Sequence, residues 1–397
     1  MEDWPSGYSE SAANARQSLP PEVWDMIVFH LRKHRGALIA CCLTCRAWLP
    51  TSRHYLLRHV RLTKKSSYNR FVEALDYAPE LPAWVDKLTI KRNRRLSTRP
   101  FDISPVLLRL SGISHLHLDV AEHVTVSPLL NTVYPSLSTI ILNVGTYRGH
   151  DIARLFSLCP RLVSLRLVSV YGDHDDPPST VDSTQPGITN SSDTCIKDLV
   201  LLITSSSIVY HLLHSPIRFE LQSLEIDGHL FASTPCPRIL WDSQSVLRSL
   251  VLRHSTWRER SDLNAVQETI GSLRLSALRS LSFEPVATPW LSTADHIVDF
   301  LNVINTDCID DIRLALCTPA HNTPYDFSHV DQTLASFARP ALRITIIIEF
   351  DGYTISGRHD LASSILSGYP QLRARGSRVQ VVVTDKFGRF PKETFHS

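Results

Sequence analysis

Three cysteines, Cys41, Cys42 and Cys45, lie close together near the start of the chain, and His54 and His59 follow a short distance downstream. Thiolates and imidazoles are the ligands that Zn²⁺ prefers, so these residues are the first candidates for a metal site. A zinc site built on this spacing needs a second ligand pair, but C-x₂-C occurs only once here. Free cysteine also packs well as a small apolar side chain. We therefore predict that the cysteines are core residues and that the chain binds no metal.

Two further clusters have residue types that bind cations. His115 and His117 alternate with Leu116 and Leu118, so the two imidazoles share one face of a predicted strand, as a metal pair would. Because the leucines belong to the core, we expect the histidines to face solvent. The run Asp-His-Asp-Asp at 173–176 is interpreted as a solvated acidic turn.

The basic stretch KLTIKRNRRLSTRP, residues 87–100, is the strongest signal for a different partner. Its six lysines and arginines could contact phosphates or serve as a nuclear import signal. No aromatic residues alternate with them to stack on bases, and the formal net charge of the chain is only +2. We interpret the stretch as a solvated loop and expect no nucleic acid partner.

No catalytic motif is readable from the sequence. A Gly-rich phosphate loop, a G-x-S-x-G elbow and an H-E-x-x-H helix are all missing, and the chain has only 14 glycines. We therefore predict that the protein is not an enzyme, with no catalytic residues and no cofactor.

Composition indicates an ordinary globular protein. With 397 residues, 43% of them hydrophobic and 20% charged, we expect a small domain plus a larger one, or a repeat array. The longest apolar runs, such as ALIACCL, are far shorter than the roughly 20 residues that cross a bilayer, so no membrane partner is expected. Residues 1–18 lack the features of a secretory signal and predict a flexible tail. The eight scattered cysteines do not form a disulfide framework, which favours a cytoplasmic and/or nuclear location.

Residues 19–59 predict a compact unit of three short helices. A proline pair at 20–21 suits a first helical turn, and apolar residues recur every four positions over a helix at 21–34, with Gly36 as its stop. A second helix is predicted over 37–46. A third follows over 53–57, after a break at Pro50.

This unit resembles an F-box. The resemblance rests on the order Leu19-Pro20-x-Glu22-Val23, then Ile27, Leu31, Leu38, Leu43, Cys45-Arg46 and Trp48. Its continuation, AWLPTSRHYLLRHVRLT, is similar to the fungal variety of these proteins, in which the box leads directly into a strand. Thr44 departs from the pattern, because the family usually has an aliphatic residue there.

The resemblance implies a function. In F-box proteins this module binds the Skp-type adaptor of a cullin–RING ubiquitin ligase, and the rest of the chain captures a target protein. The chain would then be the substrate-recognition subunit of an SCF-type ligase, with a non-degradative interaction scaffold as the alternative. Independently of the family, the unit has more apolar side chains than it can bury internally, which indicates a partner. The implied adaptor-facing or box-core set is Leu19, Pro20, Glu22, Val23, Ile27, Leu31, Leu38, Leu43 and Trp48.

Residues 60–397 carry a recurring L-x-x-L-x-L-like unit, as in RLVSLRLVSV at 161–170. Its intervals are 24 to 34 residues, and many lie in or near the range of leucine-rich repeats. We therefore predict an α/β fold in which the helical box leads into an irregular leucine-rich-repeat-like solenoid with parallel strands. The aligned strand residues are Val60, Leu88, Leu116, Ile140, Leu165, Leu199, Leu224, Leu250, Leu281, Ile312 and Ile344.

Helices are predicted between these strands, at 68–77, 151–158, 205–214, 262–273, 294–305 and 330–338, and a last strand with a cap at 377–385. Residues 172–194 are rich in Ser, Thr, Asp and Pro and predict a mobile inserted loop. Asn143 is one of the few candidates for the asparagine that closes the turn after a repeat strand.

Overall fold

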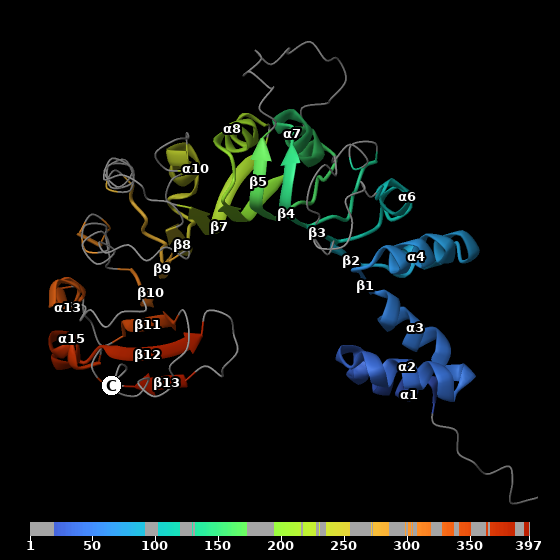
Figure 1. The fold of residues 1–397 in the computed structure, drawn as a ribbon, viewed down its shortest axis with the longest axis horizontal. Coiled ribbons are helices and arrows are strands. Elements are labelled where there is room, and N and C mark those ends of the chain that lie inside the picture. The colour runs from blue at the N-terminus through green and yellow to red at the C-terminus, as the bar shows by residue number, and fades with distance from the viewer. Residues whose placement is uncertain are drawn as a thin grey trace, which may run out of the picture.

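The computed structural model describes residues 20–91, 102–119, 132–172, 194–215, 217–227, 236–254, 273–285, 308–318, 328–336, 341–350, 366–385 and 393–396, with a few single positions between these ranges. Within them the chain is a mixed α/β protein with a thirteen-stranded, mostly parallel sheet and eleven α-helices. Figure 1 shows the strands along the inner side of an arch and the helices along its outer side. The arrangement agrees with the predicted solenoid of parallel strands.

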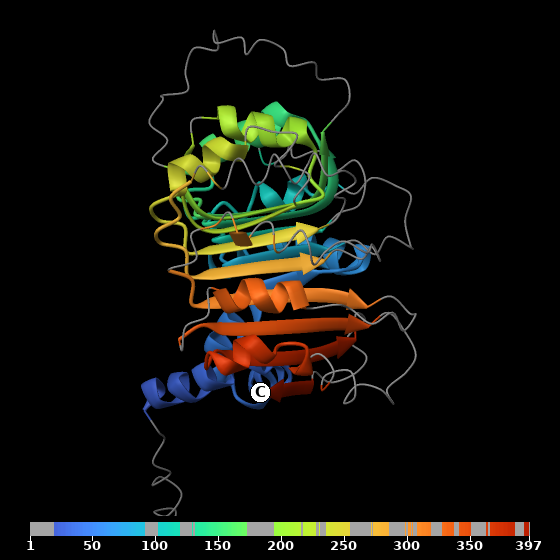
Figure 2. The ribbon, with the colours of Figure 1, turned by 90° about the vertical axis from the view of Figure 1, so that its left-hand side faces the viewer.

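The strands follow one another in the sheet in the same order as in the sequence. The first twelve are parallel, and the last is antiparallel to its neighbour. Figure 2 shows the later strands lying one beside the next. The strands are β1 (His59–Leu62), β2 (Lys87–Lys91), β3 (His115–Asp119), β4 (Thr139–Tyr147), β5 (Ser164–Gly172), β6 (Cys195–Leu202), β7 (Arg218–Asp227), β8 (Ser249–His254), β9 (Ser280–Pro285), β10 (Asp311–Thr318), β11 (Arg343–Phe350), β12 (Arg378–Asp385) and β13 (Glu393–His396).

Three helices precede the sheet, and the other described helices lie in the connections between strands. None of the described helices is both long enough and apolar enough to cross a bilayer. The helices are α1 (Pro21–His30), α2 (Arg35–Thr44), α3 (Leu49–Leu57), α4 (Lys65–Tyr77), α5 (Leu81–Trp84), α6 (Ser104–Leu107), α7 (Gly149–Ser157), α8 (Ser206–His214), α10 (Cys236–Ser243), α13 (Ser328–Ser336) and α15 (Pro370–Ala374), with the 3-10 turns η2 (Leu31–Lys33) and η3 (Arg46–Trp48).

The alignment of the repeats is confirmed residue by residue. The eleven aligned residues, from Val60 to Ile344, pair along a single row across the sheet, and the row continues to Val379 of β12. None of these side chains is more than 8% exposed. Because side chains alternate along a strand, the residues on either side of each aligned position lie on the opposite face. That concave face is lined by the polar and charged residues of the strands.

A row of hydrogen bonds joins the starts of successive strands. The carbonyl oxygen of Arg58 accepts the N–H groups of Asp86 and Lys87, and that of Asp86 accepts those of Ser114 and His115. Each repeat thereby satisfies two N–H groups of the next one, which fixes the path of the backbone into each strand. Carbonyls that accept in the same way are those of Ser114, Ser138, Val163, Arg248 and Arg279.

Two boundaries predicted for the N-terminal helices are wrong. Gly36 lies in the first turn of α2 and does not stop the preceding helix, because α1 ends at His30 and η2 continues the chain to Lys33. Pro50 does not break the third helix either. It occupies the first turn of α3, where its missing N–H costs nothing, so the helix begins before the predicted start at residue 53.

Among the repeats, the helices predicted at 68–77, 151–158, 205–214 and 330–338 correspond to α4, α7, α8 and α13 with small shifts at their ends. Those at 262–273 and 294–305 fall almost entirely outside the described residues. The strand predicted at 377–385 is β12, and the cap beyond it is the antiparallel β13. Helices α5, α6, α10 and α15 were not predicted. Helices α5, α6 and α15 have only four or five residues, too few to show a helical period.

The predicted inserted loop at 172–194 is too wide at both ends. Gly172 is the last residue of β5, and Thr194 is fully buried just before β6. Residues 173–193, including the acidic run at 173–176, lie outside the described residues. Asn143 does not close a turn, because it lies within β4, in register with Asp119 on the concave face.

The N-terminal helices continue into the sheet without a linker. Arg58 is the C-cap of α3, and β1 begins at the next residue. The Arg58 guanidinium lies 3.2 Å from the carboxylate of Asp86, which directly precedes β2, and α3 also packs against α5. These contacts join the helices to the first strands at the end of the arch seen in Figure 1.

Candidate functional site

The three N-terminal helices pack around a small interior that contains part of the predicted set. Leu38 of α2 is 1% exposed. Trp48 is half-buried, and its ring centroid lies 4.8 Å from that of Trp24 on α1. The Thr51 hydroxyl donates to the Asp25 carboxylate, which joins α3 to α1. Leu38 and Trp48 therefore hold the helices together.

Other members of the predicted set lie at the edges of this interior or at the start of α1. Val23 and Leu31 are half-buried. The carbonyl of Pro20 accepts the N–H of Val23 at 2.9 Å and so begins the helix. Glu22 is exposed in the first turn, where its charge suits the positive end of the helix dipole. Leu19 lies outside the described residues.

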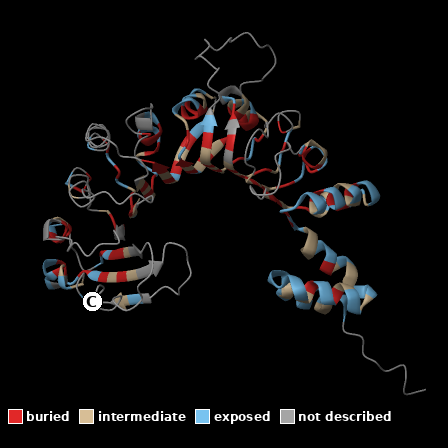
Figure 3. Cartoon of the chain, in the orientation of Figure 1, coloured by how far each residue is buried: buried red, intermediate tan, exposed pale blue. Residues whose placement is uncertain are grey.

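The remaining members, Ile27 on α1 and Leu43 on α2, are exposed, and so are other large apolar side chains of these two helices. Leu43 is 83% exposed, and Ile39, one turn earlier on α2, is 43% exposed. Met26 and Phe29 of α1 are exposed as well. Figure 3 shows how much of α1 and α2 is exposed. Because large apolar side chains on so small a unit indicate a partner, we name these five residues the docking surface.

Met26, Phe29 and Ile39 were not in the set predicted from the sequence. Helical periodicity identifies an apolar stripe but not which part of it the neighbouring helices will cover, and here Val28 is buried whereas Met26 and Phe29 stay exposed. The Phe29 ring is held in place, with the Arg32 guanidinium carbon 3.7 Å from its centroid and Tyr55 of α3 at its edge.

The structure does not bring the cysteines and histidines of the first sixty residues together as a metal site. Cys41 is buried, Cys42 and Cys45 are half-buried, and all three are free thiols. His54 stacks edge-on against Tyr55, whereas His59 lies on β1. Within the described ranges, no group of three or more His, Cys, Asp or Glu side chains could hold a metal ion.

A second candidate surface lies on the concave face of β1, β2 and β3. Strand register places six basic side chains on this face, and we name them the basic patch. The predicted outward placement of the two β3 histidines is confirmed, although both are half-buried. Residues 87–91 form β2, so the predicted basic loop at 87–100 is wrong for its first five residues, and residues 92–100 lie outside the described ranges. The patch consists of His59, Arg61, Lys87, Lys91, His115 and His117.

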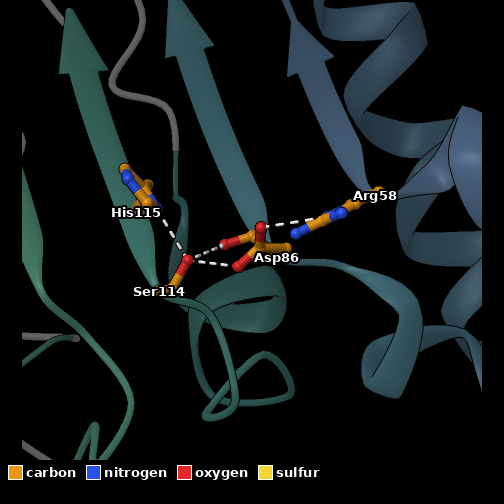
Figure 4. Close-up of polar contacts among 4 residues, drawn as sticks. All are labelled: Arg58, Asp86, Ser114 and His115. Atoms are coloured by element: carbon orange, nitrogen blue, oxygen red, sulfur yellow. Dashed lines mark hydrogen bonds and ion pairs between the residues drawn. The ribbon is translucent and has the colours of Figure 1, made fainter. Parts of the chain in front are cut away.

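Asp86 connects the basic patch to the N-terminal helices (Figure 4). Its carboxylate lies 3.2 Å from Nε of Arg58 and accepts a hydrogen bond from the hydroxyl of Ser114. The same hydroxyl oxygen lies 2.6 Å from Nδ1 of His115. Burial acts to raise the pKa of Asp86, but the bonds from Ser114 and Arg58 outweigh it and leave the pKa below its usual value.

This chain of contacts is not an activated nucleophile. A nucleophilic serine gives its proton to a base such as histidine. Here the Ser114 hydroxyl donates to Asp86, so its oxygen is left to accept from the Nδ1–H of His115. The arrangement therefore positions side chains at the edge of the patch.

The histidines of the patch are held in their neutral form. The pKa values of His59, His115 and His117 lie below the usual 6.5, mainly because the rings are partly buried. The positive charge of Lys87 lowers the pKa of the first two further, and that of Lys91 lowers the third. The amide Nδ2 of Asn143, 3.1 Å from Nε2 of His117, can donate only to the neutral ring.

These pKa values predict that stability falls with acid. We expect the free energy of unfolding to decrease as the pH falls below about 6.5, because the unfolded chain then binds more protons at these histidines than the folded chain. Above that pH the rings are neutral in both the folded and the unfolded chain, so they no longer make the free energy of unfolding depend on pH. Urea unfolding at a series of pH values measures the slope. Replacing all three histidines by glutamine should reduce it, and an unchanged slope would contradict the assignment.

Beyond the patch, the concave face becomes apolar and then mixed in charge. Ile141, Val168 and Val200 are half-buried on β4, β5 and β6. Glu225 of β7 forms ion pairs with Arg166 and Arg253, and Arg253 also pairs with Glu284 of β9. The ion pairs are Arg166–Glu225 at 4.0 Å, Arg253–Glu225 at 2.6 Å and Arg253–Glu284 at 2.7 Å.

The sequence of the chain matches no protein-family model and no curated protein. The functional argument therefore depends on the two surfaces themselves. The docking surface is apolar and lies on α1 and α2, and the basic patch is charged and lies on β1 to β3. The junction between α3 and β1 connects them.

Proposed function

We propose that the protein is the substrate-recognition subunit of an SCF-type cullin–RING ubiquitin ligase. In this proposal α1, α2 and α3 form an F-box that docks the Skp-type adaptor. The strands and helices that follow form a degenerate leucine-rich-repeat domain that binds a target protein. The observation that supports it most is the docking surface, which leaves large apolar side chains of the F-box-like segment exposed while Leu38 and Trp48 pack inside.

The energetics of the docking surface suit such a role. Removing a fully exposed Leu-sized side chain from water is worth roughly 1.5–3 kcal/mol, so covering these residues would contribute favourably to an interface with the adaptor. The chain itself would contribute no catalytic group. It would hold a target near the ubiquitin-conjugating enzyme, and the rate of transfer would rise through proximity. The proposed location is the cytoplasm, the nucleus or both.

Proximity labelling of intact cells tests the proposal. The wild-type chain should label the adaptor and the cullin, and it should label target candidates more strongly when the proteasome is blocked. A variant of the docking surface should lose the adaptor and retain the candidates. Candidates whose abundance does not change when the chain is removed or the proteasome is blocked would instead indicate a non-degradative scaffold.

A further inference from the structure

Cations from the first two strands and from the N-terminal helices converge on the basic patch, and the two β3 histidines lie beside them. The charge of Arg35, at the start of α2, acts on His59, and that of Arg58 acts on His115. Two carboxylates lie beside the patch, and each already contacts a cation. Asp86 lies 3.2 Å from Arg58, and Asp119 lies 3.4 Å from Lys91.

We propose that the basic patch binds an acidic segment of the target protein, a run of aspartate or glutamate side chains laid in extended conformation across β1, β2 and β3. The inference rests on the proposed function only in taking the target as the source of this segment. Its support is the charge of the surface and the spacing of its cations.

The spacing favours several separate carboxylates over a single compact anion. Neighbouring strands lie about 4.8 Å apart, so the cations of the patch are distributed over about 10 Å of the concave face. In an extended segment, alternate side chains are about 6.7 Å apart on one side. Two carboxylates can therefore each meet a different cation, Arg61 and Lys87, whereas Lys91 already pairs with Asp119.

The surroundings of the patch favour a protein over a nucleic acid. Register places no Phe, Tyr or Trp at the concave positions of β1 to β3, so the only planar groups there on which bases could stack are the three histidine rings and the Arg61 guanidinium. The next strands present Ile141, Val168 and Val200, with Arg166 in register between Ile141 and Val200, so a bound segment would meet apolar side chains and one further cation there. The segment expected to fit best is an acidic run followed by one or two apolar residues.

Binding of such a segment should be tighter in mild acid. A carboxylate placed beside the rings favours their charged form, so binding takes up protons and affinity increases as the pH falls from about 7.5 to about 6. Other charges face each ring and set the size of this effect. They are Lys87, Arg61, Arg35 and Asp86 for His59, Lys87, Asp86, His59 and Arg58 for His115, and Lys91, Asp119, Arg166 and Arg61 for His117.

Fluorescence anisotropy with the full chain tests the inference. The probe is a labelled peptide of four glutamates followed by leucine and valine. It should bind about tenfold more tightly than the same peptide with glutamines, and added salt should weaken it. The Arg61→Glu, Lys87→Glu variant should lose about tenfold or more in affinity. The matched variant Arg343→Glu, Arg378→Glu makes the same charge change on exposed concave residues of β11 and β12 and should bind normally.

Three outcomes would overturn the inference. They are equal affinity for the two peptides, an equal loss in both variants, or a single-stranded RNA that binds more tightly than the acidic peptide and loses affinity in the Arg61→Glu, Lys87→Glu variant. Adaptor capture is measured on the same preparations. Capture without peptide binding refutes this inference alone, and peptide binding without capture refutes the ligase proposal alone.

Discussion

Replacing Ile39 and Leu43 by aspartate should abolish capture of the Skp-type adaptor and leave the fold intact. Both side chains are exposed, so the new carboxylates remain hydrated in the free protein. In a complex that covers α2 they would lose water without gaining a partner, which costs several kcal/mol, or about 100-fold or more in affinity. Co-purification with recombinant adaptor and calorimetric titration measure the effect, with circular dichroism as the check on folding.

Two variants control this experiment. Tyr77→Asp introduces a single carboxylate at an α4 residue that is 88% exposed, and it should bind the adaptor normally. Leu38→Asp places the charge in the interior of α2 and should unfold the N-terminal helices. Undiminished adaptor binding by the Ile39→Asp, Leu43→Asp protein would mean that α2 does not face the adaptor.

Truncating Ile140 to alanine should destabilise the solenoid by about 2–5 kcal/mol, because the side chain is fully buried in the row that pairs β3, β4 and β5. The next residue provides a matched control. Ile141 has the same side chain on the same strand but lies half-buried on the concave face, so Ile141→Ala should cost less than about 1 kcal/mol. Urea unfolding of the two variants gives the comparison, and equal losses would contradict the assigned faces of β4.

The loss of stability in Ile140→Ala should also be confined to the neighbouring strands. In an array of repeats, stability is approximately a sum of contacts between neighbours. Hydrogen exchange in Ile140→Ala should therefore accelerate in β3, β4 and β5 before it does so in β11 and β12. Uniform acceleration over the whole sheet would indicate a single cooperative unit instead.

The sheet was predictable from the sequence because each strand must bury a pair of apolar residues in a fixed alternation. Val60 and Leu88 could be aligned without any structure, and the pairing of β1 with β2 confirms the alignment. The helices were less predictable. Whether Leu38 or Leu43 is buried depends on where α3 packs, and the helical period of α2 does not show this.

The basic patch was missed although the sequence contained a signal for it. Each of its residues lies one or three positions from an aligned strand residue, so register alone places Lys87 beside His115 on the concave face. The contact of Asp86 with Ser114 could not be found in this way. It depends on the side-chain conformations at two strand starts that are 28 residues apart in the sequence.

The direct passage from α3 into β1 leaves no linker between the N-terminal helices and the sheet, so a stiff junction is expected. In the proposed ligase, a bound target would be presented to the ubiquitin-conjugating enzyme at one distance and one angle. The lysines available for modification would then be those that fall within this fixed reach, whatever sequence surrounds them. The geometry at Arg58 would thus decide which lysines are modified by their position alone.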